Sequence, residues 1–275
     1  MKAYLPTILS FLIFSFSGYG QGTWLTFDCP GAIQTYLYDM PLSGPFEKFV
    51  GQVLYPPGER YPLIYDNAGC HPIGRNPAAF FAINGTNDKI IYTTESYQLV
   101  SGSKATEINY PSSFHTSVSG INDALQVIGT YRRFYSGAAS HGFLYESGTY
   151  TTIDYPDAYT TELHGINNKQ AIVGGYAIND PIFSCFIYES GQFTSLSYPG
   201  AQQTFCHRIN DSGTILGSYS YTPGNYFLYN GKFTPLPRFP GSIDTVYTSI
   251  NNDGQVGGFY TTLPDSKLHG FIYTP

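Results

Sequence analysis

Histidine is the residue of this sequence best suited to proton transfer or metal binding, and four of its six copies recur in matching contexts. His141 and His269 each begin a His-Gly-Phe-aliphatic-Tyr segment, and His164 and His207 each stand two residues before an Ile-Asn pair. If the chain folds into a ring of repeats, histidines at the mouth of its central channel would bind metal or transfer protons. Histidines that recur with a repeat can also donate ring hydrogen bonds to the neighbouring repeat, and their recurrence favours this structural interpretation.

The other chemical groups point to no familiar catalytic class. The sequence lacks a G-x-S-x-G elbow, an H-E-x-x-H zinc motif, a phosphate-binding loop and a dinucleotide fingerprint. Asp28 and Asp154 occupy equivalent places in a repeat, which indicates a structural role. Asp123, Asp211 and Asp253 lie in Asn-rich turns, and the preference of turns for aspartate explains why these residues occur there. The sequence therefore predicts no cofactor and no metal site.

Arginine and aromatic side chains form the second set of candidates. Arg132, Arg133, Phe134 and Tyr135 are consecutive, and Tyr221 lies in a comparable segment further along the chain. These segments differ in length and sequence while the turns around them repeat, as binding loops on a constant scaffold do. Tyrosines at fixed repeat positions are instead predicted to pack in the core. They are Tyr131, Tyr176 and Tyr219 in one set and Tyr145, Tyr188, Tyr229 and Tyr273 in another.

A repeat of 41 to 45 residues positions all of these candidates. Its clearest mark is an Ile-Asn turn, found at Asn122, Asn167, Asn210 and Asn251, with a degenerate copy at Asn84. After each clear copy come aliphatic residues, a glycine and an aromatic residue. A glycine within a strand is costly unless another backbone or blade packs closely against it. Each copy predicts four short antiparallel strands, which is the size of one propeller blade.

Six such units account for most of the chain. They span residues 33–77, 78–112, 113–158, 159–201, 202–242 and 243–275. The last unit lacks a fourth strand, and residues 24–32 match the fourth-strand pattern of the other units. We therefore predict an all-β fold, a six-bladed β-propeller of four-stranded repeats whose N-terminal strand completes the last blade. An open solenoid is the alternative, and its ends would need no such complement.

The repeat pattern is G-I-N-[ND]-x-[GQ]-x-[IV]-[VL]-G-x-Y, followed by H-G-F-[LI]-Y and I-D-x-P-[GD]-A. This pattern resembles that of the bacterial HAF-repeat extracellular proteins. The resemblance covers residues 113–275 well, residues 24–32 as one strand and residues 33–112 poorly. It implies a secreted protein of propeller-like repeats and no particular activity, because a propeller hosts many functions.

The order of turns divides such a propeller into two faces. Tight turns within each blade share one face, and the longer loops share the other with the crossings between blades. His141 and His269 are predicted to open third strands near this long-loop face, and His164 and His207 to open first strands that line the central channel. The ligand-binding candidates are therefore these four histidines and the loop residues Arg132, Arg133, Phe134, Tyr135 and Tyr221.

The first 20 residues have the features of a signal peptide, with Lys2, an apolar run from Leu5 to Phe16 and small residues before Gln21. The run is too short to favour a membrane anchor, so the remaining domain, 21–275, is predicted to be secreted, either extracellular or periplasmic, with no membrane span after signal cleavage. A formal charge of −6 argues against nucleic acid as a partner. The expected partner is an unknown extracellular ligand, either a glycan or a protein surface.

Four cysteines in an exported chain permit two disulfides. Three connectivities are possible, and none of the cysteines has the spacing of a zinc site. Cys185 and Cys206 lie in neighbouring units, and Cys29 ends the closing strand beside the unit that contains Cys70. The pairs Cys185–Cys206 and Cys29–Cys70 are therefore the first choice.

Binding leads the functional hypotheses: a secreted repeat protein that acts as a binding or surface-interaction module through its long-loop face. The alternative is an extracellular hydrolase or lyase with a histidine site at the channel mouth, and a third possibility is a purely structural role. A cluster of His141, His164 and His207 beside a carboxylate favours the enzyme. Dispersed histidines bonded to backbone carbonyls favour the binding module.

Overall fold

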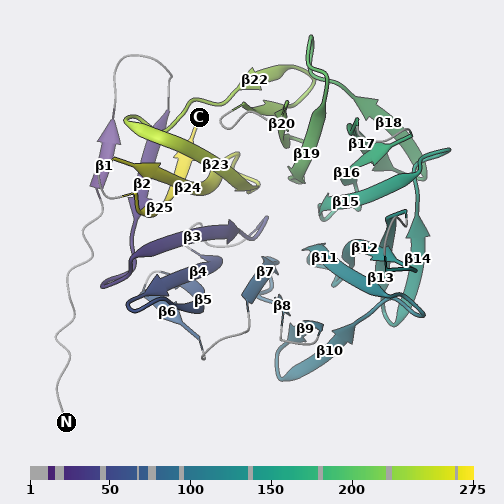
Figure 1. Cartoon of the computed structure of the whole chain (residues 1–275), viewed down its shortest axis with the longest axis horizontal. Helices are drawn as coiled ribbons and strands as arrows, with labels where there is room; N and C mark the ends of the chain where they lie inside the picture. Colours follow the sequence, from purple (N-terminus) through teal and green to yellow (C-terminus); the bar gives the residue numbers. More distant parts are fainter. Residues whose placement is uncertain are drawn as a thin grey trace.

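Six β-sheets surround a central axis in the computed structural model (Figure 1). The structure describes residues 12–15, 22–43, 48–66, 68–73, 79–92, 96–135, 139–178, 182–220, 225–263 and 266–275. Within these ranges the regular elements are all strands. No helix in this part of the chain is long and apolar enough to cross a membrane. The predicted all-β, six-bladed propeller is confirmed.

Each blade is an antiparallel sheet, and in blades 1 to 5 the strands run in chain order from the axis outward (Figure 1). Blade 1 contains β3 (Gln34–Asp39), β4 (Phe49–Tyr55), β5 (Glu59–Asp66) and β6 (Gly69–Pro72). Blade 2 contains β7 (Ala79–Ile83), β8 (Lys89–Tyr92), β9 (Tyr97–Ser101) and β10 (Lys104–Ile108). Blade 3 contains β11 (His115–Ile121), β12 (Val127–Arg132), β13 (His141–Glu146) and β14 (Thr149–Ile153).

The second half of the ring repeats this plan. Blade 4 contains β15 (Thr160–Ile166), β16 (Ile172–Ala177), β17 (Ser184–Glu189) and β18 (Gln192–Leu196). Blade 5 contains β19 (Thr204–Ile209), β20 (Ile215–Tyr219), β21 (Tyr226–Tyr229) and β22 (Phe233–Pro235). Blade 6 contains β23 (Ser242–Ile250), β24 (Val256–Thr262), β25 (Leu268–Thr274) and then β2 (Thr23–Phe27).

The N-terminal strand β2 closes the ring, as the sequence predicts. It pairs with β25 from Thr23–Thr274 to Phe27–Gly270. Trp24 anchors it, because its ring is buried against several aromatic rings of blade 6. A further strand, β1 (Leu12–Ser15), pairs with the outer side of β2. It lies in the predicted signal peptide, so cleavage before Gln21 would remove it and leave a four-stranded blade.

Two disulfides link neighbouring blades, and both pairs are those that the sequence favours. Cys29–Cys70 joins the end of the closing strand to β6 of blade 1, with the Cα atoms 5.6 Å apart. Cys185–Cys206 joins β17 of blade 4 to β19 of blade 5, with the Cα atoms 5.4 Å apart. Each disulfide therefore adds a covalent link between two neighbouring blades.

In five of the six blades a glycine of the second strand lies against the backbone of the inner strand, which confirms the close packing expected from its position. A Cβ atom at Gly174 would lie 2.1 Å from the carbonyl oxygen of Glu162. The inner strand bulges beside this contact, because its register shifts between Leu163 and Gly165 and leaves His164 unpaired. The equivalent shift in each of the other five blades leaves one residue of the inner strand unpaired. These residues are Tyr38, Phe81, Ser119, His207 and Thr248. We call these six the bulge residues.

The Ile-Asn turns link blades 2 to 6 by a series of hydrogen bonds on the tight-turn face. In Asn167, Oδ1 accepts the backbone N–H groups of Lys169 and Ala171, while Nδ2 donates to the carbonyl of Asn210 in the next blade at 2.9 Å. The same blade-to-blade bond is made by Asn84, Asn122 and Asn210. The repeat needs asparagine here because this side chain must both accept and donate.

Candidate functional site

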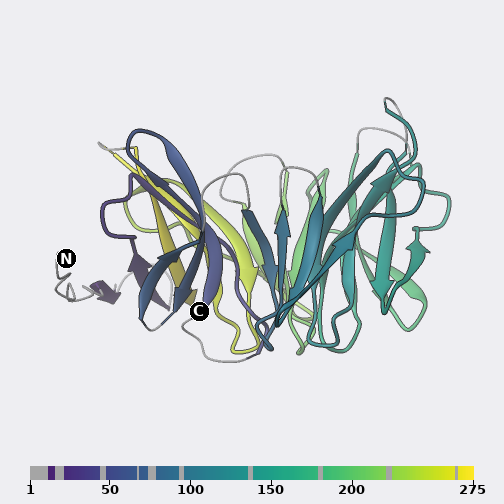
Figure 2. The ribbon, with the colours of Figure 1, turned by 90° about the horizontal axis from the view of Figure 1, so that it is seen from below.

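The two faces of the propeller differ in what they expose. Long loops and blade crossings lie on the upper side of Figure 2, and the tight turns lie on the lower side. Among the described residues, the large hydrophobic side chains that are exposed all belong to the long-loop face. They are Ile73, Tyr92, Phe114, Phe134, Tyr135, Tyr159, Ile178, Ile182, Ile243 and Leu263.

The loop candidates of blade 3 lie on this face. Phe134 and Tyr135 are 70% and 83% exposed, and the ring of Tyr135 meets that of Phe114 edge-on at 4.9 Å. Arg133 lies over the ring of Tyr131 at 5.9 Å. Arg132 is held by a hydrogen bond from its Nε to Ser140 Oγ at 2.8 Å. Tyr221, the remaining loop candidate, lies outside the described residues.

His141 and His269 form two equivalent pairs with aspartates. His141 Nδ1 is 2.8 Å from Asp154 Oδ2, and His269 Nδ1 is 2.8 Å from Asp28 Oδ2. Each imidazole also stacks on the tyrosine of the neighbouring second strand. Third and fourth strands of one blade are thereby joined at their long-loop ends. This accounts for the equivalence of the two aspartates in the sequence.

His164 and His207 lie deeper in the channel than predicted. They are bulge residues, the fifth residue of β15 and the fourth of β19, and do not open these strands. The strands begin earlier because a threonine at their start is fixed to the preceding crossing. In blade 5 the hydroxyl of Thr204 accepts the N–H of Tyr198 at 2.9 Å, and blade 4 has the same bond.

His164 joins its blade to the next one. Its Nδ1–H donates to the carbonyl of Cys206 at 2.8 Å. The bulge residue Thr248 likewise donates to Leu37 of the next blade at 2.9 Å, and Ser119 donates to Leu163. His164 Nε2 also lies 3.6 Å from Glu162, whose pKa is lowered mainly by this hydrogen-bonding contact. His164 therefore has the structural role that its recurrence in the repeat predicts, a ring hydrogen bond to the neighbouring blade.

His207 departs from this pattern. Its Nε2 lies 2.8 Å from Ser218 Oγ on its own blade, so the ring does not make the blade-to-blade bond of His164. Burial, followed by the charges of His164 and Arg208, lowers the pKa of His207 to about 3. The imidazole is therefore neutral at physiological pH.

Arg208 follows His207 and stands where the third and fourth blades have glycine. Its Nη1 donates to the carbonyls of His164 and His207, each at 2.9 Å. Its Nε lies 3.5 Å from Oδ1 of Asp39, on β3 of blade 1. Burial raises the pKa of Asp39, and the guanidinium opposes this rise. Because blade 6 stands between blades 5 and 1, this ion pair reaches across the central channel.

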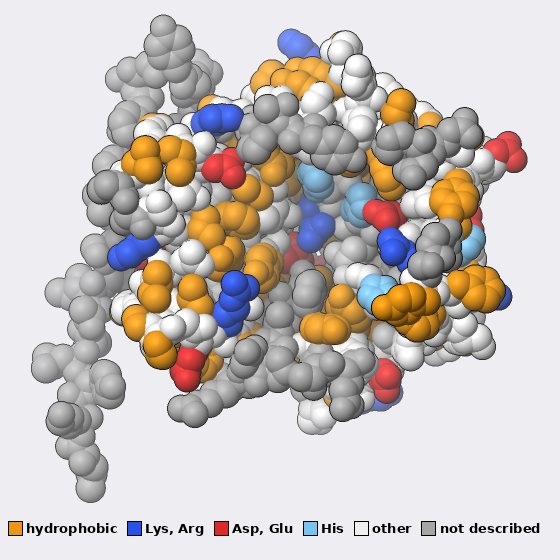
Figure 3. All heavy atoms as spheres, in the orientation of Figure 1, with side chains coloured by type: hydrophobic (Ala, Val, Ile, Leu, Met, Phe, Trp, Pro, Cys, Tyr) orange, Lys and Arg blue, Asp and Glu red, His pale blue; other side chains and the backbone are white. Residues whose placement is uncertain are grey.

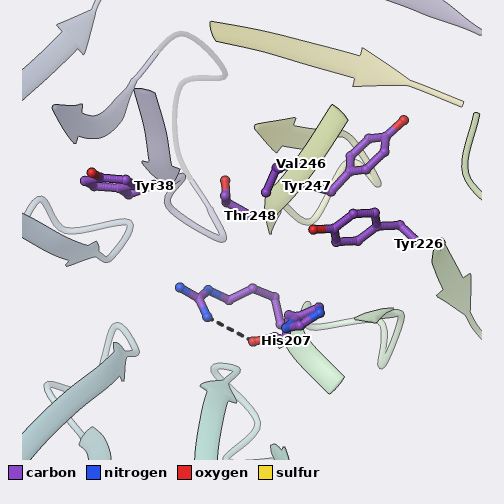
Figure 4. A pocket seen from close by; sticks show the side chains of 7 residues that line it. Tyr38, His207, Tyr226, Val246, Tyr247 and Thr248 are labelled. Carbon is purple, nitrogen blue, oxygen red and sulfur yellow. Dashed lines mark hydrogen bonds between the residues drawn. The ribbon is translucent and has the colours of Figure 1, made fainter. Parts of the chain in front are cut away.

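A cavity of about 350 Å³ lies beside this pair, at the junction of blades 5, 6 and 1 (Figure 4). Its walls are formed by Tyr38, His207, Arg208, Tyr226, Val246, Tyr247 and Thr248. The Tyr226 hydroxyl points into the space between His207 and Thr248 (Figure 4). The Tyr247 hydroxyl points away and donates to the carbonyl of Pro237 at 2.6 Å. Burial, and then Asp244, raise the pKa of Tyr226, so its hydroxyl stays protonated.

The cavity belongs to the long-loop face. Tyr226 opens β21 directly after the loop that joins the second and third strands of blade 5. Viewed from this face, the centre of the ring is hollowed, and histidine and cationic side chains lie within the hollow (Figure 3). Among the described residues, no group of three or more His, Cys, Asp or Glu side chains could hold a metal ion.

Of the polar residues that line the cavity, only His207 was predicted from the sequence. Tyr38, His207 and Thr248 are all bulge residues, and in the clear repeats the bulge residue stands three positions before the turn asparagine. That spacing could have identified Thr248. Arg208 could have been noticed as the one cation at the glycine position of the Gly-Ile-Asn motif. Tyr38 lies in the divergent first unit, where the motif is absent.

No protein-family model and no curated protein matches this chain. Solved propellers do match. The β-propeller domain of the Trilobed protease from Pyrococcus furiosus has a TM-score of 0.54 at 10% identity and covers 96% of this chain and 95% of its own. A gluconolactonase from Xanthomonas campestris has a TM-score of 0.54 at 10% identity, with coverage of 92% and 89%. TolB from Acinetobacter baumannii has a TM-score of 0.51 at 12% identity, with coverage of 87% and 63%.

At these identities the likeness shows the fold alone, a β-propeller. The protease domain is described as having an open velcro topology. Here β2 pairs with β25, so the first and last blades are joined through an N-terminal strand. The chain is thus a propeller closed by its N-terminal strand.

Proposed function

We propose that this protein is an exported binding module that holds an extracellular glycan or protein through its long-loop face. The observation that carries this proposal is the confinement of the exposed large hydrophobic side chains to that face. Soluble proteins rarely gather apolar side chains on one exposed side unless it meets a partner or ligand. Tyr135 and Phe114 form an aromatic pair there, and the central cavity opens within the same face.

The tight-turn face supports the same proposal by contrast. Its turn asparagines bond each blade to the next, and the residues that follow them add a second set of bonds. The backbone N–H of Asp123 donates to Asn168, that of Asn168 donates to Asp211, and that of Asp211 donates to Asn252. These side chains are committed to holding the ring together, so they are poorly placed to recognise a ligand.

The competing enzyme hypothesis receives less support from the histidines. His141 pairs with Asp154 near the long-loop end of its blade, whereas His164 and His207 lie in the channel, so the three do not form one cluster. Among the residues that the structure describes, Glu162 is the one carboxylate paired with either channel histidine. A general base works best when its pKa is near the working pH, and that of His207 is about 3. Binding therefore suits this channel better than hydrolysis or elimination.

Export and the HAF-repeat family are part of the proposal. Two disulfides without a free cysteine among the described residues suit an oxidising compartment, either extracellular or periplasmic. The repeated Gly-Ile-Asn and His-Gly-Phe segments support membership of the HAF-repeat proteins. Expression of the full chain with a C-terminal tag, followed by N-terminal sequencing of the exported product, tests the predicted cleavage before Gln21.

Binding is tested by screening the exported protein against glycan and envelope-protein panels. The variant Phe134→Ser/Tyr135→Ser removes apolar surface from the long-loop face, and Lys169→Ala changes an exposed side chain on the tight-turn face. We expect retention of the bound glycan or protein to fall at least tenfold in the first variant and to stay unchanged in the second. Equal retention by both variants, or no retained partner at all, would overturn the proposal.

A further inference from the structure

We propose that the cavity beside Arg208 binds the carboxylate of a small hydroxylated ring compound, a uronic acid residue, either free or at the end of a glycan. This inference rests on the proposed function and names the ligand class of its central cavity. It depends on three features of the walls: an incompletely used guanidinium, neutral polar groups around it, and aromatic faces opposite them.

Arg208 supplies the anion-binding group. A guanidinium carries five N–H donors, and here Nε faces Asp39 while Nη1 serves two carbonyls. Within the described part of the chain, Nη2 makes no hydrogen bond. No carboxylate is among the described residues that line the cavity. A carboxylate oxygen placed against Nη2 would therefore gain a charge-assisted hydrogen bond without displacing an existing one.

The remaining polar groups suit hydroxyls rather than a second charge. The Tyr226 hydroxyl points into the cavity and stays protonated, so it can donate to a ligand oxygen. His207 is neutral and uses Nε2 for Ser218, which leaves Nδ1 for the ligand. Rings of Tyr226 and Tyr247 meet edge-on at 5.4 Å and offer apolar surface to the C–H groups of a sugar ring.

Size and charge narrow the ligand class. A volume of about 350 Å³ is near the lower limit of small-molecule pockets, which matches one sugar ring better than a longer segment. An amine would meet the charge of Arg208, and an apolar ligand would leave the donors of Arg208 and Tyr226 unpaired. A neutral sugar would use the hydroxyl partners but would place no charge beside Nη2.

Two ligands that differ only at the carboxylate test the inference. Binding of glucuronate and of glucose to the exported protein is measured by NMR titration, following the resonances of the His207 ring. We expect glucuronate to bind at least tenfold more tightly than glucose. Equal affinities, or no binding of either sugar, would overturn the uronate assignment, while retention of other ligands in the panel screen would leave the proposed function standing.

Two matched tyrosine variants locate the site. Tyr226→Phe removes a hydroxyl that points into the cavity, and Tyr247→Phe removes one that is bonded to Pro237. We expect Tyr226→Phe to weaken glucuronate binding about fivefold and Tyr247→Phe to change it less than twofold. Equal effects of the two variants would overturn the assignment of this cavity. Both variants conserve the aromatic rings that line it.

A third arm separates the two sources of the ligand. An oligosaccharide that ends in a uronate is compared with the free sugar acid. Tighter binding of the oligosaccharide supports the inference with a glycan end as ligand, because the exposed aromatic residues around the cavity would contact further sugars. Equal affinity supports it with the free acid. Binding of an oligosaccharide that lacks any uronate with the same affinity would contradict it.

Discussion

At the residue scale, the turn asparagines show how one side chain can serve two blades. Asn167 accepts two backbone N–H groups of its own turn and donates to Asn210 of the next blade. The repeat revealed these residues in the sequence, yet turn chemistry alone explains only the accepting half. The donating half depends on how close the next blade lies, which a single repeat cannot indicate.

Replacement of Asn167 by aspartate tests this double role. The variant keeps the accepting oxygen but places a carboxylate where Nδ2 now donates to a carbonyl. We expect the free energy of unfolding to fall by about 2–3 kcal/mol at pH 7. Urea denaturation of Asn167→Asp and of the surface control Lys169→Ala measures the difference. A loss no greater than in the control would contradict the blade-to-blade role.

His207 predicts a pH dependence of stability. Its pKa is about 3 in the folded protein against 6.5 for an unperturbed histidine, so the unfolded chain binds a proton first as the pH falls. Its contribution is complete above about pH 6.5 and is lost toward pH 3. We expect about 1–2 kcal/mol to be lost between pH 7 and pH 5, because in this window the unfolded histidine takes up its proton and the folded one does not. Denaturation curves of wild type and His207→Gln should diverge in that window, and parallel curves would contradict the prediction.

At the element scale, the glycine of the second strand packs against the inner strand beside its bulge, so the two features belong together. The sequence predicted close packing at this glycine, and Gly174 indeed faces the carbonyl of Glu162. The bulge itself could not be predicted, because it is a register shift between two strands and leaves no composition signal of its own. For this reason the sequence placed His164 and His207 at the strand openings, whereas the structure places both within the strands.

Gly174→Ala tests the coupling of the two strands. Its new methyl group would lie 2.1 Å from backbone oxygen, and neither strand can move without breaking its ladder. We expect a loss of about 3 kcal/mol or more in the free energy of unfolding. Gly102→Ala is the control, because Gly102 has open space around it and a φ of +57°, so strain of about 1 kcal/mol is expected there. Equal losses of stability in the two variants, measured by thermal denaturation, would contradict the predicted clash at Gly174.

At the scale of the whole molecule, the chain ends determine the architecture. The missing fourth strand of the last unit and the matching segment 24–32 predicted a closed ring, and β2 does pair with β25. The same reasoning placed Cys29 beside Cys70. The cavity could not be predicted in this way, because its walls come from three blades and one of its residues, Tyr38, lies in a unit without the motif.

Removal of the Trp24 side chain tests the closure. Trp24 is 5% exposed and packs against Phe239, Phe271 and Tyr273. We expect Trp24→Ala to lower the free energy of unfolding by about 3–5 kcal/mol, since a large cavity would open at the closing strand. Phe134→Ala, at an exposed aromatic residue of the long-loop face, should change it by less than about 0.5 kcal/mol. Similar urea midpoints for the two variants would contradict an anchoring role.

The most direct measurement of the central claim is hydrogen–deuterium exchange of the exported protein with and without its retained glycan or protein partner. We predict that exchange slows in the long loops, in the blade crossings and at the channel residues Tyr226 and Thr248. The tight turns around Asn122, Asn167, Asn210 and Asn251 should exchange at unchanged rates. Protection confined to those turns would contradict the assignment of the long-loop face as the binding surface.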